Sequence, residues 1–192
     1  MLLGNINRIL IFLALVCLCT SDQEDRIVIG YRVVAKAEAR LINQRNRPFR
    51  DPARDSRAAS QIGNGVYLAN KPGGWQGIRR TTNHHCVFKA DKNKFNNAAK
   101  AWVPSDHWNS GEESIARYIQ GFGLNPDATV RISYIVGYGQ ALQMLLPTTM
   151  VNADTLDLFA ICFSSKAKLM AYEKDIVDWT EWDLYGEPGV PG

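Results

Sequence analysis

Residues that build common catalytic and metal centres are scarce in this chain. It contains four cysteines and three histidines among 192 residues. No Cys-x-x-Cys pair, Gly-x-Ser-x-Gly elbow or phosphate-binding P-loop occurs in it, which argues against the zinc, hydrolase and nucleotide sites that these patterns build. His84 and His85 are neighbours, so on a strand their side chains point to opposite faces and cannot share one metal ion. The sequence therefore predicts no metal site.

A strong charge of either sign is also missing. The chain has 22 Lys and Arg against 19 Asp and Glu, a net charge of +3. Arg8 is the one charged residue in the first 21 positions, so the rest of the chain carries +2. A balance this mild does not build the positive field of a nucleic-acid binder. The six arginines between positions 40 and 57 favour a solvated loop, with a phosphate or acidic-partner contact as the alternative.

Only one long apolar run is present, and it lies at the N-terminus. Arg8 is followed by the run from Ile9 to Leu18 and then by small residues. The run is shorter than the ~20 residues that span a bilayer, and its flanks are typical of a secretory signal peptide. We expect residues 1–21 to be this signal and residues 22–192 to form a single secreted domain without a membrane span.

The small number of cysteines allows one disulfide in the predicted mature domain. Cys17 and Cys19 lie in the predicted signal, so Cys86 and Cys162 remain. Two cysteines in an oxidising compartment favour a bridge between them. Two buried thiols are the alternative.

The patterns along the chain predict an α+β fold. Strands are expected at 27–34, 66–69, 85–90, 101–103, 130–136 and 142–146, and helices at 35–43, after Ser110, and at 164–172. Ser110 and Glu113 have the spacing of a capping box, in which each side chain satisfies a backbone donor at the start of the helix.

Three separated segments carry a resemblance to a known family. They are Gly30-Tyr31-Arg32, the stretch from Ser60 to Asn70 that contains Gly-Asn-Gly-Val-Tyr-Leu-Ala, and Ala141-Leu-Gln-Met-Leu-Leu-Pro. In this order they resemble the ADP-ribosyltransferase superfamily, including the enterotoxin-like proteins predicted to be secreted by fungi. The first resembles its arginine strand, the second its serine and tyrosine strands, and the third its Q-x-E-V-L-L-P strand.

The resemblance implies a fold, a ligand and a set of roles. The fold is a split β-sandwich with flanking helices, and the ligand is NAD, taken as a substrate. Arg32 would hold the pyrophosphate, because a guanidinium bonds phosphate bidentately. Ser60 would support the ribose strand, Gly65 would let backbone approach the ligand, and Tyr67 would stack on nicotinamide. Gln143 would bind the ribose hydroxyls.

The departures from the pattern bear on activity. Gln143 stands where the family has its catalytic glutamate, and Ala141 replaces the upstream glutamine. The amide keeps the shape but removes the anion that stabilises an oxocarbenium-like transition state. We therefore expect a toxin- or effector-like mono-ADP-ribosyltransferase or NAD glycohydrolase, or else an inactive binding protein with an unknown target. Whether Glu112, Glu113 or Glu173 reaches the cleft beside Gln143 discriminates between these readings.

Overall fold

The computed structural model of the chain describes residues 25–57, 60–75 and 82–191. The predicted signal at 1–21 lies outside the described residues. The fold is α+β, as the sequence predicts, with one mixed seven-stranded sheet and five helices in the described part of the chain. The strands are β1 (Arg26–Ala35), β2 (Gly65–Ala69), β3 (Asn83–Asp91), β4 (Lys100–Trp102), β5 (Val130–Tyr134), β6 (Leu142–Pro147) and β7 (Phe159–Phe163).

The helices are short and lie between the strands. They are α2 (Lys36–Arg45), α3 (Lys92–Asn97), α4 (Glu112–Gln120), α5 (Thr148–Ala153) and α6 (Lys166–Tyr172). Short 3₁₀ helices occupy Pro52–Arg57, Ser105–His107, Pro126–Ala128 and Trp179–Glu181. Two of the helices begin with side-chain caps: Asp91 accepts from the Lys94 N–H, and Ser165 accepts from the Lys168 N–H. These caps satisfy backbone donors that the first turn of a helix leaves free.

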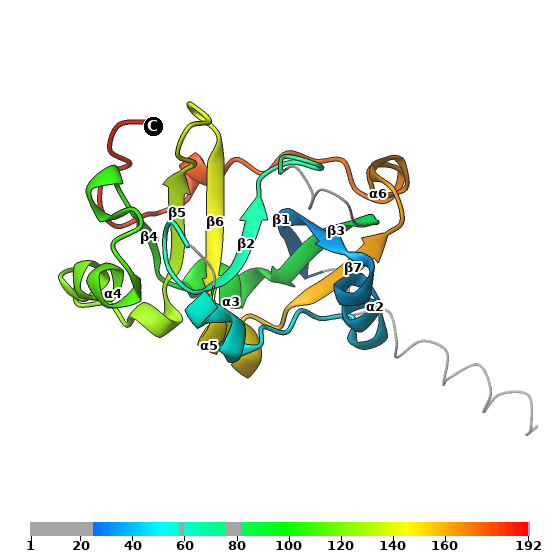
Figure 1. Cartoon of the computed structure of the whole chain (residues 1–192), viewed down its shortest axis with the longest axis horizontal. Helices are drawn as coiled ribbons and strands as arrows, with labels where there is room; N and C mark the ends of the chain where they lie inside the picture. Colours follow the sequence, from blue (N-terminus) through cyan, green and yellow to red (C-terminus); the bar gives the residue numbers. More distant parts are fainter. Residues whose placement is uncertain (1–24, 58–59, 76–81, 192) are drawn as a thin grey trace, which may run out of the picture.

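The sheet consists of two groups of strands with a narrow junction. Its order is β4-β5-β6-β2-β1-β3-β7, with β4 and β5 parallel and every other pair antiparallel. At the junction, β1 and β2 share one registered pair, Tyr31 with Ala69, whereas β1 and β3 pair along nearly their whole length. Figure 1 shows the groups β4-β5-β6-β2 and β1-β3-β7 on opposite sides of this junction. Beyond Tyr31, β1 therefore diverges from β2.

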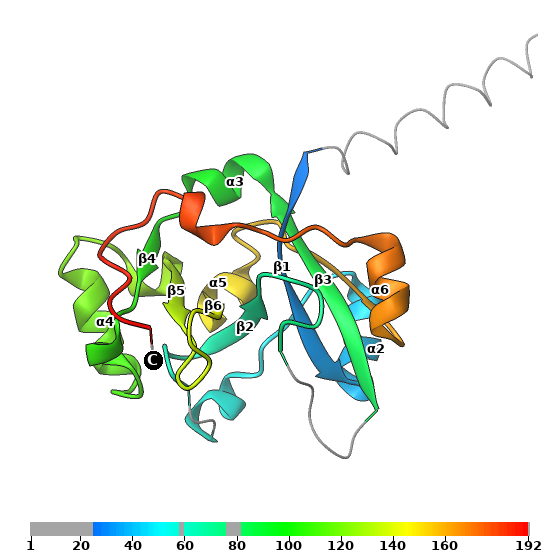
Figure 2. The ribbon, with the colours of Figure 1, turned by 90° about the horizontal axis from the view of Figure 1, so that it is seen from above.

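Both groups contribute to the main hydrophobic core. This core contains Ile29 and Phe88 from one group and Met144 and Leu146 from the other, together with Trp179 from the C-terminal segment. Two smaller hydrophobic clusters lie apart from this main core. Residues of α4 pack with β6 in one cluster, and Leu169 of α6 packs with β1 and β3 in the other. Seen from above in Figure 2, α4 and α6 lie at opposite ends of the molecule.

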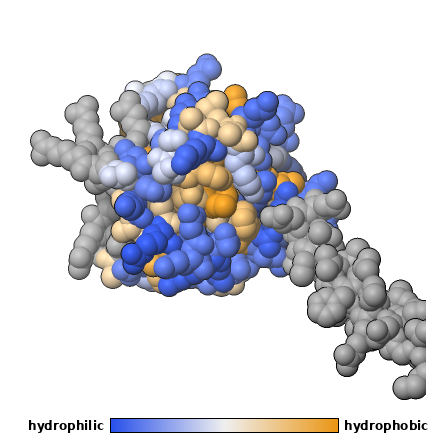
Figure 3. Space-filling model, turned by 90° about the vertical axis from the view of Figure 1, so that its right-hand side faces the viewer, coloured by the Kyte–Doolittle hydropathy of each residue, from blue (hydrophilic) through white to orange (hydrophobic). Residues whose placement is uncertain are grey.

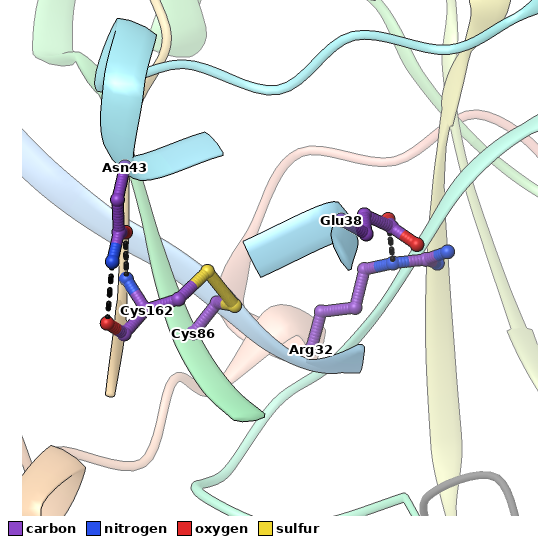
Figure 4. Close-up of a disulfide and its surroundings, with 5 residues drawn as sticks. All are labelled: Arg32, Glu38, Asn43, Cys86 and Cys162. Carbon is purple, nitrogen blue, oxygen red and sulfur yellow. Dashed lines mark hydrogen bonds and ion pairs between the residues drawn. A yellow bond between two sulfur atoms is a disulfide. The ribbon is translucent and has the colours of Figure 1, made fainter. Parts of the chain in front are cut away.

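A disulfide joins β3 and β7, the last two strands of the sheet. Cys86 of β3 and Cys162 of β7 are bonded and are also registered partners in the sheet, which confirms the predicted bridge. Asn43 of α2 donates to the Cys162 carbonyl at 2.9 Å and accepts from the Cys162 N–H at 2.8 Å. These two hydrogen bonds tie α2 to β7, as Figure 4 shows.

On the other side of the junction, a fully buried arginine pairs with a carboxylate of α4 that is 34% exposed. Arg131 of β5 is fully buried, and its Nη2 lies 2.7 Å from Glu112 Oε1 while Nη1 lies 3.1 Å from Oε2. The guanidinium also donates to the carbonyls of Ile62 and Pro126. Gly63 passes over this pair with φ +104°, and a Cβ there would overlap Arg131 Nη1. The backbone of the loop before β2 is therefore fitted against the ion pair.

The capping box predicted at Ser110 and Glu113 is wrong. The N-cap of α4 is Gly111, with φ 85° and no side-chain cap. The Ser110 hydroxyl donates instead to the His107 carbonyl of the preceding turn. Glu113 is almost fully exposed and pairs with Arg117 one turn later. The Ser110 hydroxyl therefore bonds to the preceding turn rather than capping the helix, which is the role that the sequence pattern predicts.

The face that carries α2, β7 and α6 presents apolar side chains among hydrophilic ones (Figure 3). Leu41 of α2 and Met170 of α6 belong to these elements and are exposed. Among the described residues, no helix is long and apolar enough to cross a membrane.

Candidate functional site

A cavity of about 420 Å³ lies along the gap where β1 diverges from β2. Its lining comes from strands β1, β2 and β6, from the first turn of α2, and from the segments that precede β2, follow β2 and follow β5. The volume falls within the ~300–1,000 Å³ of small-molecule sites. Arg32, Tyr67 and Gln143 all line it, so residues separated by more than a hundred positions meet at one cavity.

Arg32 reaches across the gap between the two groups of strands. Its Nη1 donates to the Tyr67 carbonyl of β2 at 3.0 Å, and its Nε lies 3.4 Å from Glu38 Oε1. The side chain is 20% exposed. Burial lowers the pKa of Arg32 from its ordinary value, and the Glu38 carboxylate opposes that effect. The guanidinium remains cationic at neutral pH, because arginine does not lose its proton in proteins.

Tyr67 is held in place by the loop that precedes its strand. Its hydroxyl accepts from the Ile62 N–H at 3.0 Å and donates to the Gly63 carbonyl at 2.9 Å. The ring packs against the cluster that contains Leu145 and residues of α4. Burial raises the pKa of Tyr67 to about 12, and hydrogen bonds from Ile62 and Ser60 partly offset the rise. The residue is therefore a rigid and neutral part of the wall.

Gln143 belongs to a small network of polar groups around one carbonyl. Its Nε2 donates to the Tyr134 carbonyl at 3.3 Å. The same oxygen accepts from Ser133 Oγ at 2.8 Å and from Gln61 Nε2 at 2.7 Å. Gln143 is nearly buried, so the network sets its orientation. With its nitrogen bound to Tyr134, Gln143 has a carbonyl oxygen that no hydrogen bond within the described residues uses.

Two predicted site residues are not part of the lining. Ser60 lies beside the Tyr67 hydroxyl rather than in the cavity wall. Gly65 packs against β6, where a Cβ would overlap the Leu146 carbonyl oxygen. Close approach of two strands therefore accounts for this glycine, and its role toward a ligand stays a prediction.

One carboxylate lines the cavity, and the sequence patterns do not single it out. It is Glu38, in the first turn of α2, with a side chain that is 35% exposed. None of Glu112, Glu113 and Glu173 is among the lining residues. Their partners are Arg131, Arg117 and Lys89, respectively. Figure 4 shows Glu38 and Arg32 beside each other, from α2 and β1.

The mouth of the cavity carries exposed aromatic side chains that sequence reasoning missed. Trp75 follows β2 and Tyr138 lies in the turn between β5 and β6, and their ring centroids are 5.6 Å apart. About half of each residue is exposed. Tilted rings at this distance pack favourably, and their free faces suit a flat ligand ring. Isolated tryptophan and tyrosine residues in loops give no sequence pattern that would have found them.

The lining of the cavity combines one paired cation with neutral polar groups and aromatic surface. Arg32 supplies positive charge, the Gln143 amide supplies neutral hydrogen bonding, and the rim supplies flat apolar surface. No group of three or more His, Cys, Asp or Glu side chains in the described ranges is placed to hold a metal. The lining therefore offers one cation, neutral hydrogen-bonding groups and flat apolar surface to a ligand.

Comparisons with known proteins give a family but no activity. No curated protein matches the chain. Residues 60–187 match a protein family that is described as "Family of unknown function (DUF5910)". This range includes Tyr67 and Gln143, while Arg32 and Glu38 precede it. Because the match extends over more than half of the sequence, this chain belongs to the DUF5910 family.

Proposed function

We propose that this protein binds NAD in the cavity between its two groups of strands and cleaves the bond between nicotinamide and ribose. The observation that carries the proposal is the meeting of Arg32, Tyr67 and Gln143 at one cavity. These residues come from three segments that resemble, in the same order, the strands of ADP-ribosyltransferases. The split between β1 and β2 supports the finer assignment of the fold as the split β-sandwich of that superfamily.

In this proposal, each lining residue binds a different part of NAD. Arg32 binds the pyrophosphate through the guanidinium hydrogens that Glu38 and the Tyr67 carbonyl leave free. Gln143 accepts a hydrogen bond from a ribose hydroxyl through its carbonyl oxygen. The nicotinamide ring stacks on the aromatic wall, formed by Tyr67 or by the more exposed Trp75 at the rim.

Hydrolysis fits this site better than transfer to a protein. An amide at position 143 can orient ribose, but it supplies no charge to activate an acceptor side chain. Water needs less activation by position 143 if another group in the cavity takes its proton. The product of the reaction is then free ADP-ribose, and the protein is an NAD glycohydrolase.

A second candidate is a binding protein that keeps the fold without the chemistry. It is favoured by the internal bonds of the site: the Tyr67 hydroxyl and the Gln143 Nε2 already have protein partners. In this reading the cavity binds NAD or a fragment without turnover, and the target is a host or partner protein.

Secretion is part of the proposal. The Cys86–Cys162 bridge supports it, because structural disulfides persist in oxidising compartments. N-terminal sequencing of protein from the growth medium tests it. We expect the first residue to fall between Thr20 and Glu24, and extracellular protein that begins at Met1 would contradict the export signal.

The test of the function is an NAD-consumption assay on the secreted protein with its bridge intact. We expect release of nicotinamide and ADP-ribose, and loss of NAD binding in Arg32→Ala. Arg117→Ala is the matched control, because Arg117 is a surface residue outside the cavity. Binding without turnover would establish the binding protein, and absence of both would refute the assignment of NAD.

A further inference from the structure

The cavity contains one negatively charged side chain, in the first turn of α2. Among the lining residues that the structure describes, Glu38 is the only carboxylate. We propose that Glu38 is the catalytic carboxylate of this protein and that it removes the proton from the water that attacks ribose C1′. This inference rests on the proposed NAD cleavage and names the group that makes hydrolysis work.

The contact between Glu38 and Arg32 leaves Glu38 available for this task. The two groups approach at 3.4 Å through Arg32 Nε and Glu38 Oε1, which is longer than the ~2.7–2.9 Å of a tight charged hydrogen bond. The second carboxylate oxygen has no hydrogen bond or ion pair within the described part of the chain. A water molecule can therefore bind to it while Arg32 holds the phosphates.

The position of Glu38 is fixed by the surrounding structure. It lies in the first turn of α2, a ten-residue helix. At the other end of α2, Asn43 is bonded twice to the Cys162 backbone. Cys162 is in turn bridged to Cys86, which is the registered partner of Arg32. Glu38 and Arg32 are thus held by the same rigid group of strands.

The step balances without any further reactant. The bond between ribose C1′ and the nicotinamide nitrogen breaks, and its electron pair goes to the pyridinium ring, which becomes neutral. A water oxygen bonds to C1′, and its proton passes to Glu38 and then to solvent. The products are nicotinamide, ADP-ribose and one proton. Gln143 holds a ribose hydroxyl throughout, and Arg32 holds the phosphates.

A purely positioning role for Glu38 makes different predictions. If the carboxylate only orients Arg32, Glu38→Gln keeps an oxygen that can accept from Nε and should turn over NAD normally. Glu38→Ala would then weaken NAD binding and raise KM. If Glu38 is the base, the glutamine cannot take a proton, and kcat falls while binding persists.

The experiment compares kcat, KM and NAD affinity in wild type, Glu38→Gln and Glu38→Ala, with Glu113→Gln as an exposed carboxylate control. We expect kcat of Glu38→Gln to fall by about 100-fold or more, with NAD affinity within about threefold of wild type. Retained NAD affinity shows that the variant is folded.

Two results would overturn the inference, and they differ. An active wild type whose Glu38→Gln variant keeps kcat within about threefold would remove Glu38 from the chemistry and leave NAD cleavage intact. A wild type that neither binds nor consumes NAD would refute the proposed function and the role of Glu38 with it.

Discussion

The two groups of strands are stabilised by different chemistry. In β1-β3-β7, a covalent bridge and the Asn43 side chain hold the strands and α2 together. In β4-β5-β6-β2, the Arg131–Glu112 pair lies under the loop that leads into β2. The first group contributes Arg32 and Glu38 to the cavity, and the second contributes Tyr67 and Gln143. Each side of the site therefore has its own support.

This difference means that the two walls can be disturbed separately. The bridge keeps β3 and β7 from separating locally, whereas an ion pair with a buried partner stabilises only while both partners are present. Reduction should act on the wall with Arg32, and removal of a charge should act on the wall with Tyr67. Four measurements test this separation, beginning with the largest expected effect.

Removal of Glu112 should have the largest effect. Glu112→Ala leaves the fully buried Arg131 without its carboxylate, and an unpaired buried charge costs about 3–5 kcal/mol of unfolding free energy. Glu113→Ala is the matched control, because its side chain is 95% exposed, and we expect a change within about 0.5 kcal/mol. Urea unfolding measures both variants. Equal losses in the two would show that the buried pair contributes no special stability.

Removal of the bridge should come next. Cys86→Ala with Cys162→Ala opens a link between residues 76 positions apart and should cost about 2–4 kcal/mol. Hydrogen exchange should accelerate in β3 and β7 and change little in β5 and β6. Mass spectrometry with and without reductant provides the control on wild type. Two freely alkylated thiols in the native secreted protein would contradict the bridge.

Alanine substitutions at Gly63 and Gly111 distinguish the effect of steric crowding on stability from the effect of backbone conformation. Both have positive φ, but a Cβ at Gly63 overlaps Arg131, whereas nothing lies within 4 Å of one at Gly111. Gly111→Ala should lower the free energy of unfolding by about 1–3 kcal/mol from conformation alone, because φ 85° and ψ 161° lie in a region that glycine almost alone adopts. Gly63→Ala should cost about 1–3 kcal/mol more, because it also displaces the ion pair. If thermal or urea unfolding gives the two variants the same stability, the loop is not fitted to Arg131.

Tyr67→Phe should have the smallest effect at neutral pH, about 1 kcal/mol, because it removes the hydroxyl's hydrogen bonds to Ile62 and Gly63. Its clearer signature is at high pH. The pKa of Tyr67 rises from 10.0 to about 12 in the folded chain, so the folded state holds the phenol proton more tightly than the unfolded state. The resulting stability is complete below pH 10 and is lost as pH rises toward 12.

Urea unfolding at several values between pH 8 and pH 11 checks this dependence. We expect wild type to lose stability more steeply than Tyr67→Phe over that range. Absorbance titration should show one fewer late-ionising tyrosine in the variant. Parallel stability profiles in the two proteins would count against a buried, neutral Tyr67.

Much of the fold could be predicted because its strands carry local patterns. The strand predicted at 27–34 spans Arg26–Ala35, and the one predicted at 142–146 spans Leu142–Pro147. The helices α3 and α5 and the strand β7 were missed. Each has five or six residues, and none of the three shows a helical spacing or an alternation of apolar and polar residues. Their positions are set by packing against the main core, which no local pattern records.

The site could be predicted only in part for a related reason. Arg32, Tyr67 and Gln143 were found because strand segments around them resemble a family pattern. Glu38 was missed, because an acidic residue in the first turn of a helix usually reflects the helix dipole and contact with water. Its position beside Arg32 depends on how α2 folds back over β1. This packing of α2 on β1 is a tertiary contact, which no local sequence pattern records.

The separation of the two cysteines also sets an order of assembly. The chain is made from its N-terminus, so β3 is complete long before β7 exists, and the edge of β3 that β7 covers has no strand partner in the meantime. Unpaired edges invite association between chains, and the thiol of Cys86 must await Cys162. The last strand to leave the ribosome therefore closes the sheet and the covalent loop together. A chain that stops before Phe159 lacks both.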